Sequence, residues 1–282
     1  LTIVSNGTCS ITASQAGDVN WLAATDVSQS FTVSQKGLTV SGTTASNKTY
    51  DRTVTATPNF GSSTLVGKVG SDDVTLVTAG GTAAFADKTV ATGKTVTISG
   101  LVLGGTTASR YSLTQPTTTA SITAATLTVN GITSNNKTYD GLASATSLLN
   151  TGSASLSGVI GADAVTLVTG SATGTFPDKN VGTGRTVTIA GLTLTGTDAA
   201  NYSLTQPTTT ASITAKGLTV SGVTANDKTY DRTATATLNT GSAALVGKVA
   251  GDSLSIDVTA AAGAFPDKLV GSNRTVTVSG IT

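Results

Sequence analysis

Runs in which apolar and polar residues alternate cover most of the chain. In Thr95–Ile98, which reads Thr-Val-Thr-Ile, the valine and isoleucine would face a core and the threonines solvent, because successive side chains of a strand point to opposite faces. Val, Ile and Thr favour extended backbone, since branching at Cβ stiffens the side chain and packs well on a pleated surface. Glycines between the runs mark turns. The pattern predicts an all-β fold built from short strands.

The segment of residues 37–125 shows most clearly where strands should lie, because turn glycines separate its alternating runs. Strands are expected near Leu38–Thr43, Thr53–Thr57, Ser63–Val66, Val74–Thr78, Thr82–Phe85, Thr95–Leu103, Arg110–Thr114 and Thr118–Thr123.

The same pattern recurs along the chain with a period of about 90 residues, and three sets of residues mark it. The first set comes from the sequence Lys-Thr-Tyr-Asp and comprises Lys48, Tyr50 and Asp51, then Lys137, Tyr139 and Asp140, then Lys228, Tyr230 and Asp231. The second set comprises Phe85, Asp87 and Lys88, then Phe176, Asp178 and Lys179, then Phe265, Asp267 and Lys268. The third set begins at Lys94, Arg185 and Arg274 and reads Thr-Val-Thr-Ile or Thr-Val-Thr-Val after the basic residue. The segment Tyr111–Ala124 is identical to Tyr202–Ala215.

We therefore predict three tandem copies, at residues 37–125, 126–216 and 217–282, with the last incomplete because it stops before a counterpart of Tyr111–Ala124. A period near 90 residues is too long for a solenoid coil and suits one immunoglobulin-like β-sandwich of roughly 100 residues. Few residues and no Pro-rich or Gly/Ser-rich linker separate the copies. The sequence thus predicts tandem immunoglobulin-like sandwiches in an elongated, fairly stiff array.

Charge and residue usage exclude several classes of function. The formal net charge is +1, which lacks the clustered Lys and Arg of a nucleic-acid footprint, and no apolar run is long enough to span a bilayer. The chain has no His and one Cys, so Ser–His or Cys–His catalysis and a Cys/His zinc site are impossible. No phosphate loop of the form GxxxxGK[ST] is present. We expect no enzyme activity, no cofactor and no membrane insertion of this segment.

The repeat markers carry a family resemblance. The Lys-Thr-Tyr-Asp sequence, followed by Gly141 in the second copy, and the closing Tyr-Ser-Leu and Ala-Ser-Ile-Thr-Ala sequences resemble the YDG and MBG-type bacterial immunoglobulin-like repeats. Such repeats occur in very large secreted or surface-attached proteins, including filamentous-haemagglutinin-like adhesins. Arg52 and Arg232 stand where the family name implies glycine, which should alter the chemistry of those turns.

Residues 1–36 do not follow the repeat and resemble the end of a different bacterial immunoglobulin-like domain. The resemblance implies that Cys9 is half of a disulfide whose partner stretch is missing, which would suit an oxidising compartment. The alternative is that Cys9 is a small buried apolar residue. Trp21, the only tryptophan, is expected in the core, although it could instead stack on a sugar.

The Lys and Asp residues of the markers have two interpretations. Their aspartates can bind nearby backbone amides in turns, and Tyr50 can cap one end of the core. The sharper hypothesis is an intramolecular Lys–Asp or Lys–Asn isopeptide bond, which needs a buried neutral lysine and a protonated carboxyl.

Two ligands remain open. The pair Asp72-Asp73, with single counterparts Asp163 and Asp252, is a candidate Ca²⁺ site or a set of solvated turn residues. Threonine strings such as Thr53–Thr57 could present hydroxyl rows to a carbohydrate or ice surface, or could be ordinary solvent-facing strand residues.

Together these features favour a non-catalytic stalk or spacer of a bacterial adhesin, extracellular and either secreted or on the cell surface, that projects a distal binding domain. Its partners would be neighbouring repeats of the same chain, with polysaccharide or a host surface bound through other domains of the parent protein. The alternative is a module that itself binds carbohydrate or a host surface, and an enzyme is the third hypothesis.

Overall fold

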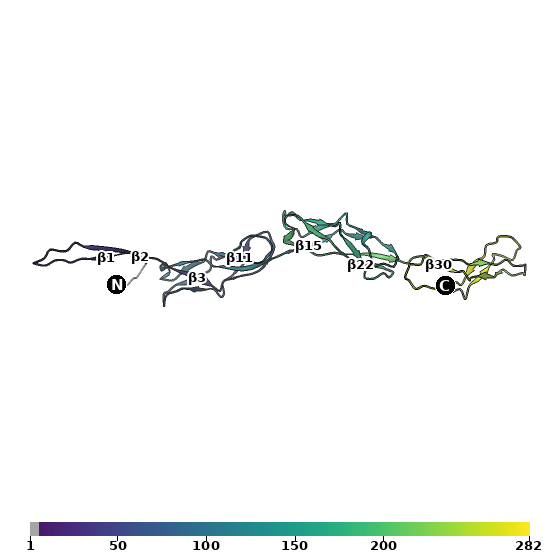
Figure 1. Cartoon of the computed structure of the whole chain (residues 1–282), viewed down its shortest axis with the longest axis horizontal. Coiled ribbons are helices and arrows are strands. Elements are labelled where there is room, and N and C mark those ends of the chain that lie inside the picture. Colours follow the sequence, from purple (N-terminus) through teal and green to yellow (C-terminus); the bar gives the residue numbers. More distant parts are fainter. Residues whose placement is uncertain (1–5) are drawn as a thin grey trace. The chain divides into compact units, whose positions relative to one another are not determined.

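The computed structural model describes residues 6–282 and is all-β over that range (Figure 1). The only helical elements there are three single-turn 3₁₀ helices. The described chain divides into two compact units. Unit 1 comprises the described residues up to Leu127 together with Gly158–Thr166 and Thr195–Ser203, and unit 2 comprises Thr128–Ser157, Leu167–Leu194 and Leu204–Thr282. The predicted second copy is therefore shared between the units, because two of its segments pack with the first copy.

Unit 1 begins with a long antiparallel hairpin, β1 (Gly7–Ala13) and β2 (Val27–Val33), whose strands pair from Gly7 with Val33 to Ala13 with Val27. Most of its side chains are exposed, and among residues 6–282 its two strands pair only with each other. This hairpin corresponds to the N-terminal segment of residues 1–36, and residues 1–5 of that segment lie outside the described range.

The first copy, here called repeat 1, contains a five-stranded sheet in the order β5-β14-β11-β10-β6, in which β5 and β14 run parallel and the other neighbours antiparallel. Smaller groups of strands complete it, in the orders β13-β3-β8, β12-β9 and β4-β7. Its elements are β3 (Lys36–Ser41), β4 (Thr44–Ala45), β5 (Lys48–Thr49), β6 (Thr55–Ala56), β7 (Pro58–Asn59), β8 (Thr64–Val66), β9 (Thr75–Val77), β10 (Thr82–Phe85), β11 (Ala91–Ser99), β12 (Val102–Gly104), η1 (Ala108–Arg110), β13 (Tyr111–Leu113) and β14 (Thr117–Thr123).

The core of repeat 1 follows the alternation of its strands. Val96 and Ile98 of β11 are fully buried, whereas Thr95 and Thr97, which alternate with them, are exposed, as the sequence pattern predicts. A second buried group contains Leu38, Val74 and Tyr111.

One predicted strand of repeat 1 is wrong in extent. The expected strand Thr95–Leu103 is two strands, β11 and β12, because the chain turns at Gly100. Gly100 has φ +78°, and a Cβ there would lie 2.3 Å from the carbonyl oxygen of Gly80. Only glycine fits a turn with this conformation and this close approach.

Repeat 2, the second copy, begins with β15 only one residue after β14 ends, which confirms the expected short joint. Within unit 2 it forms the sheet β17-β25-β22-β21, again with one parallel pair, β17 and β25. Its elements are β15 (Ala125–Asn130), β16 (Thr133–Ser134), β17 (Lys137–Thr138), η2 (Thr146–Leu148), β18 (Leu149–Asn150), β19 (Ser155–Ser157), β20 (Thr166–Val168), β21 (Thr173–Thr175), β22 (Gly182–Ala190), β23 (Thr193–Thr195), η3 (Ala199–Asn201), β24 (Tyr202–Leu204) and β25 (Thr208–Thr214).

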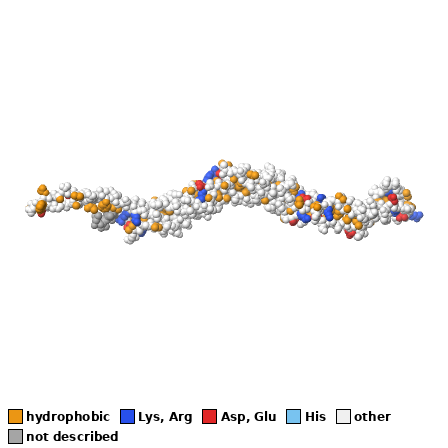
Figure 2. Space-filling view, in the orientation of Figure 1, with side chains coloured by type: hydrophobic (Ala, Val, Ile, Leu, Met, Phe, Trp, Pro, Cys, Tyr) orange, Lys and Arg blue, Asp and Glu red, His pale blue; other side chains and the backbone are white. Residues whose placement is uncertain are grey.

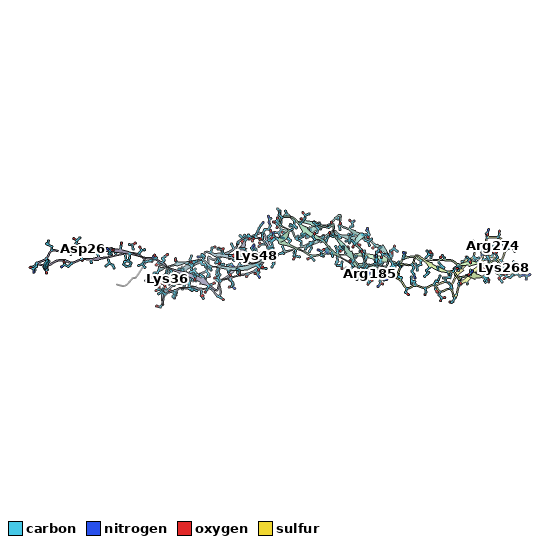
Figure 3. The ribbon with its side chains drawn as sticks, viewed as in Figure 1. Asp26, Lys36, Lys48, Arg185, Lys268 and Arg274 are labelled. Atoms are coloured by element: carbon cyan, nitrogen blue, oxygen red, sulfur yellow. The ribbon has the colours of Figure 1, made fainter. Side chains whose placement is uncertain are left out.

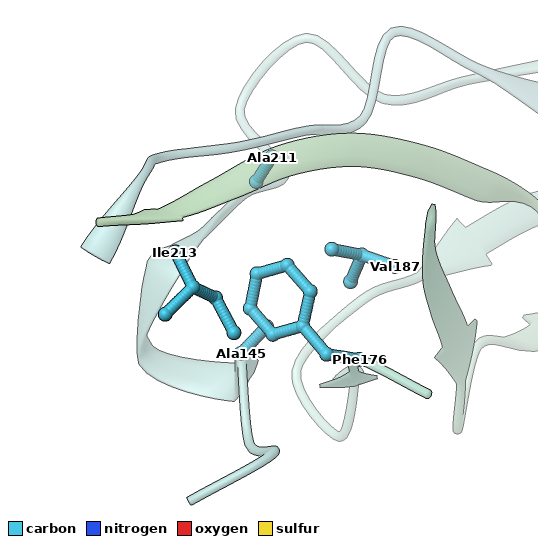
Figure 4. Packing of buried hydrophobic residues seen from close by; sticks show 5 residues of the cluster. All are labelled: Ala145, Phe176, Val187, Ala211 and Ile213. Atoms are coloured by element: carbon cyan, nitrogen blue, oxygen red, sulfur yellow. The ribbon is translucent and has the colours of Figure 1, made fainter. Parts of the chain in front are cut away.

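The core of repeat 2 centres on Phe176. Figure 4 shows its ring between Ala145, Val187, Ala211 and Ile213, so that β22 and β25 both contribute apolar side chains to one cluster. Burying a phenylalanine in this way contributes about 1.5–3 kcal/mol relative to leaving it exposed.

Repeat 3, the third copy, lies wholly in unit 2 and is the least regular. Its strands form two pairs, β26-β30 and β27-β29, and the sheet β28-β31-β32. They are β26 (Thr219–Ser221), β27 (Thr224–Ala225), β28 (Thr235–Ala236), β29 (Leu238–Asn239), β30 (Ala244–Val246), β31 (Ala262–Ala264) and β32 (Thr277–Ser279).

Candidate functional site: the joint between repeats

Charged side chains gather in small groups on the surface rather than spreading evenly along the chain (Figure 2). The first kind of group is the Lys-Thr-Tyr-Asp turn. In repeat 1 the Nζ of Lys48 lies 2.7 Å from Oδ1 of Asp51 and donates to the carbonyl of Thr53, while the amide of Thr53 donates to the same Asp51 oxygen. The ammonium also lies 5.7 Å from the centre of the Phe85 ring. The structure thus brings together Lys48, Asp51 and Phe85 from two sets of markers.

Repeats 2 and 3 build the same turn. Lys137 pairs with Asp140 at 2.8 Å and lies 5.8 Å from the Phe176 ring centre, and Lys228 pairs with Asp231 at 2.8 Å. Lys48 and Lys137 thus bridge a turn and a buried aromatic residue, which is a structural role.

The electrostatics of this turn oppose an isopeptide bond. Although partial burial of Asp51 opposes the shift, hydrogen bonds from Lys48 and Thr53 lower its pKa. The hydrogen bond from Lys228 likewise lowers the pKa of Asp231 to about 2. An isopeptide bond needs a protonated carboxyl, whereas these hydrogen bonds favour the ionised carboxylate.

The second kind of group surrounds the aspartate of the Phe-x-Asp-Lys marker. Asp87 accepts hydrogen bonds from the Thr89 amide and from Lys94 of β11, and these contacts lower its pKa. Asp178 pairs in the same way with Arg185 at 2.7 Å, and Asp267 with Arg274. The basic residue that opens the third set of markers is thus the partner of this aspartate. The adjacent lysine, Lys88 in repeat 1, is not needed for this ion pair.

The residue after each Lys-Thr-Tyr-Asp sequence has a left-handed backbone. Gly141 has φ +81°, and Arg52 and Arg232, which replace glycine, have φ +69° and +68°. The expected change in these turns does not extend to the backbone, because Arg52, Gly141 and Arg232 share one conformation. A non-glycine residue there costs about 1–2 kcal/mol, so a compensating contact is expected.

That contact lies in unit 1, where repeat 1 meets the two segments of repeat 2 that pack with it. Nε of Arg52 is 2.9 Å from Oδ1 of Asp163. The hydroxyls of Tyr50 and Tyr202 donate to Oδ2 of the same carboxylate at 2.9 and 2.7 Å. The two tyrosine rings meet edge to face with centres 5.5 Å apart. These four residues are called joint 1.

Burial strengthens joint 1. The Asp163 side chain is only 1% exposed, so its charge depends on these partners. Burial alone would raise the pKa of Asp163, but the hydrogen bonds from Tyr202 and Tyr50 and the charge of Arg52 outweigh it and lower that pKa. Burial and the hydrogen bond to Asp163 raise the pKa of Tyr50 to about 12. The geometry therefore holds a carboxylate ionised and two phenols neutral over a wide pH range.

A further hydrogen bond crosses joint 1. The amide of Val90, which lies in repeat 1, donates to Oδ1 of Asn201 of η3 at 3.0 Å, and Asn201 is buried. The amide of Ile160 donates to the Tyr202 hydroxyl at 3.0 Å, so this hydroxyl both accepts and donates. Buried polar groups at joint 1 are thus satisfied by partners from the other repeat or from their own.

Unit 2 contains the corresponding contact between repeats 2 and 3, called joint 2. The hydroxyl of Tyr139 donates to Asp252 at 2.8 Å, and Nζ of Lys179 lies 3.0 Å from the same oxygen. The ammonium is also 5.8 Å from the centre of the Tyr139 ring. Here the cation comes from the Phe-x-Asp-Lys marker instead of the position after Tyr-Asp, where repeat 2 has Gly141. A cavity of about 450 Å³ adjoins these residues.

Asp72 of repeat 1 is the counterpart of Asp163, and it accepts a hydrogen bond from Tyr111 at 2.6 Å. Its neighbour Asp73 accepts from the amide and hydroxyl of Thr106. Residues 6–282 contain no cluster of three or more acidic, His or Cys side chains that could hold a metal ion. The two aspartates thus serve separate turns, and the geometry favours that interpretation over the Ca²⁺ hypothesis.

The hairpin corrects one sequence expectation. Trp21 is 75% exposed near the loop that joins β1 and β2, where the amides of Asn20 and Trp21 donate to Asp18. It is not a core residue, because the hairpin has no apolar layer to receive it. Cys9 is a free, half-buried thiol opposite Phe31 on β2, and its disulfide remains a prediction.

A family model for the YDG domain matches residues 34–120, 123–211 and 214–282. The chain belongs to the YDG-domain family. No curated protein and no solved structure matches it. The tyrosine and aspartate of the family's name have different roles in this YDG chain: Asp51 and Asp140 close a turn within their own repeat, whereas Tyr50 and Tyr139 reach the next repeat.

The sequence singles out the YDG tyrosines, and Asp163 and Asp252 as candidate Ca²⁺ ligands or turn residues, but it does not predict that these groups pair or that Tyr202 joins them. A signal was present, because Asp72, Asp163 and Asp252 recur with the repeat period and Tyr202 lies in a segment identical to one in repeat 1. Thr53, Thr55 and Thr57 are exposed, and the Thr53 hydroxyl donates to Asp51 within the turn. No helix in the described part of the chain is long and apolar enough to cross a membrane.

Proposed function

We propose that these YDG repeats are a non-catalytic spacer of a secreted or surface-attached bacterial adhesin, and that they project a binding domain of the parent protein. The observation that carries the proposal is the recurrence of one contact at two successive joints. A YDG tyrosine of one repeat donates to an aspartate of the next, and a cation from the first repeat pairs with that aspartate. A contact repeated between tandem domains restrains each against its neighbour, which is what a spacer needs.

The connections between repeats support the same function. Only Ala124 separates β14 from β15, so the backbone itself allows little bending at joint 1. The hydrogen bond from Val90 to Asn201 adds a third attachment there. We infer that the joints are stiff and that a tandem array of such repeats extends rather than folds back.

We also propose that each repeat is an immunoglobulin-like sandwich. Strands of repeat 1 fall into one larger and several smaller groups, and the inward faces of β11 and β14 bury Val96, Ile98 and Ile122. Alternation of buried and exposed residues along both strands is typical of sheets that cover a shared core on one face.

The ionisable groups support a non-catalytic role. Most of the lysine and aspartate markers form ion pairs within turns or across joints, and those contacts lower the pKa values of Asp51, Asp140 and Asp178. General acid–base catalysis at neutral pH requires the opposite, a carboxyl whose pKa is raised toward 7.

Solution X-ray scattering tests the spacer proposal. A globule of this length would have a radius of gyration of about 19 Å, and a spacer should have a value well above that. Tyr50→Phe combined with Asp163→Ala should broaden the distribution of distances by loosening joint 1, whereas Thr97→Ser on the exposed face of β11 should not. A radius near 19 Å for the unaltered chain would refute the proposal.

A second candidate function is binding of carbohydrate or a host surface, and the exposure of Trp21 favours it. Leu22 and Val19 are exposed beside it, so the β1–β2 loop presents a small apolar surface on which a sugar ring could stack. Glycan-array binding that is lost in Trp21→Ala would support this function. Equal binding by the variant, or none by either protein, would exclude this surface.

A further inference from the structure

Strands from the start and from the end of repeat 1 pair in parallel. β3, which opens the repeat, pairs with β13, and Lys36 lies opposite Tyr111. β5 pairs with the C-terminal part of β14, which closes the repeat, and Lys48 lies opposite Ile122. Figure 3 labels Lys36 and Lys48, with which β3 and β5 begin, toward opposite ends of repeat 1. Each end of the repeat therefore has one parallel pair that joins its early strands to its late ones.

Parallel pairing determines how such a repeat responds to tension. When the two ends of the chain are pulled apart, an early strand is drawn toward its own N-terminus and the closing strand toward its own C-terminus. Two parallel strands loaded in this way slide along each other, so the evenly spaced hydrogen bonds between them carry the load together. A hairpin pulled apart at its open end, in contrast, loses its hydrogen bonds one after another.

Further hydrogen bonds reinforce the pairing of β5 with β14. The amide of Tyr50 donates to the carbonyl of Thr123 at 2.8 Å, and the Thr123 hydroxyl donates to the carbonyl of Lys48 at 3.3 Å. Just before β5, Oδ1 of Asn47 accepts from the amide of Ser121 at 2.7 Å. The residues on both sides of this two-residue strand are thus bonded to β14 as well.

Repeat 2 has the same set of contacts in unit 2. Its strands β17 and β25 run parallel. Oδ1 of Asn136 accepts from the amide of Ser212 at 2.7 Å, and the amide of Tyr139 donates to the carbonyl of Thr214 at 2.8 Å. The arrangement is therefore a property of the repeat and not of one copy.

The closing strand of each of these repeats is an interior strand of its sheet. β14 lies between β5 and β11, and β25 lies between β17 and β22. Each also buries an isoleucine, Ile122 or Ile213, whose side chain is 1% exposed. The closing strand cannot peel away from an edge, because it must lose hydrogen bonds on both sides and its apolar contacts at the same time.

Tension reaches the paired strands with little slack in between. Only Ala124 separates β14 from β15, and only Ser34 and Gln35 separate β2 from β3. The side chain of Gln35 is itself attached, because its Nε2 donates to the carbonyl of Ser109 at 2.9 Å. A pull along the chain is therefore applied to β3 and β14 and not to a flexible loop.

We propose that repeats 1 and 2 each contain a shear clamp, which keeps the repeat folded when the chain is under tension. The clamp of repeat 1 consists of β3 with β13 and of residues 47–50 with β14, and that of repeat 2 contains residues 136–139 with β25. This function goes beyond spacing, since a spacer that only sets a distance need not resist a pull.

The test is single-molecule pulling of the full chain at constant force, with handles attached at its two ends. Either clamped repeat should release about 300 Å of chain when it unfolds, which identifies its step. Asn47→Ala combined with Asn136→Ala removes one clamp bond from each repeat. This variant should unfold in such steps about fivefold faster, because forced unfolding is governed by the unfolding rate.

A matched variant removes the same kind of bond outside the clamp. Oδ1 of Asn59 and of Asn150 accepts from the turn amides of Gly61 and Gly152 at 3.0 and 3.3 Å. Asn59→Ala combined with Asn150→Ala should change the rate of the 300 Å steps less than about twofold under the same force. Denaturant midpoints of both double variants, measured without force, show how much each one destabilises the fold.

A conservative variant tests the role of the accepting oxygen. Asn47→Asp combined with Asn136→Asp keeps an acceptor for the two serine amides and should unfold within about twofold of the unaltered chain. Equal acceleration by the two alanine variants, no acceleration by the clamp variant, or no recovery with aspartate would each overturn the proposal. A chain can be extended and still lack a clamp, so this result is independent of the scattering experiment.

Discussion

The two joints share one arrangement, in which an aspartate accepts a hydrogen bond from a tyrosine and pairs with a cation. They differ in how many groups surround the aspartate. At joint 1, Asp163 has two tyrosine hydroxyls and an arginine around it, and its side chain is 1% exposed. At joint 2, Asp252 has one tyrosine and a lysine, and its side chain is 16% exposed. The second hydroxyl at joint 1 comes from Tyr202, which belongs to the closing segment of repeat 2. A joint is therefore completed by the far end of the following repeat, not by the adjacent residues alone.

The largest expected effect comes from removing the shared acceptor. Asp163→Ala leaves two buried hydroxyls and Arg52 without their carboxylate, which should cost about 2 kcal/mol locally and speed exchange of the Tyr50 amide about 30-fold. Asp252→Ala should speed exchange of the Tyr139 amide by a smaller factor, because fewer groups depend on it. Asp163→Asn, which still accepts hydrogen bonds, is the control. Equal factors for the two alanine variants would show that the number of groups around the aspartate does not matter.

The second prediction concerns the left-handed turn of repeat 2. Gly141→Ala should destabilise joint 2 by about 1–2 kcal/mol, because φ is positive and the new Cβ would lie 2.8 Å from Cγ1 of Val249. Adding Val249→Ala should recover the part due to the collision and leave the backbone strain. The denaturation midpoint of the full chain measures both. An unchanged midpoint for Gly141→Ala would contradict the assigned conformation.

The third prediction follows from ionisation at joint 1. Because the pKa of Tyr50 is about 12 in the folded chain and 10 when unfolded, its contribution is complete below pH 10 and is lost as pH rises toward 12. The pKa of Asp163 is lowered, so its contribution is complete above pH 3.8 and is lost as pH falls below that value. Ultraviolet titration of the tyrosines should show Tyr50 ionising late.

Asp163→Ala is the control for this titration, since the removal of the negative charge should bring the late tyrosine transition closer to pH 10. A titration identical in the variant and the unaltered chain would mean that Asp163 does not govern the pKa of Tyr50.

The smallest effect is expected for Arg52→Gly. The change removes the ion pair with Asp163 but also relieves the strain at φ +69°, so the two terms, each about 1 kcal/mol, nearly cancel. Exchange of the Tyr50 amide should change less than about threefold. Arg52→Ala loses the ion pair and keeps the strain, so it should exchange several-fold faster. If Arg52→Gly were the worse variant, the ion pair would outweigh the strain.

The sequence predicts the repeat and most strands because both arise from local patterns. Alternation at Val96 and Ile98 identifies a core face, and turn glycines separate the runs. It does not predict two-residue strands such as β5, whose pairing with β14 joins residues more than 70 positions apart. A strand this short has no periodicity of its own to detect.

The joints are harder still to predict. Tyr50 and Asp163 are 113 residues apart and belong to different repeats, so no motif contains both. The left-handed backbone of Arg52 is also hidden, because arginine gives no sign of the conformation that Gly141 makes plain. The sequence favours a core position for Trp21, whereas this residue is 75% exposed on the two-stranded hairpin.

Identical spacing at both joints has a consequence for how such genes change length. Tyr139 is separated from Asp252 by the same 113 residues that separate Tyr50 from Asp163. Recombination that duplicates or deletes one whole repeat in register therefore keeps each joint tyrosine opposite an aspartate of the next repeat. An insertion of part of a repeat changes the spacing between the tyrosine and its aspartate. The array should therefore lengthen or shorten in steps of one repeat.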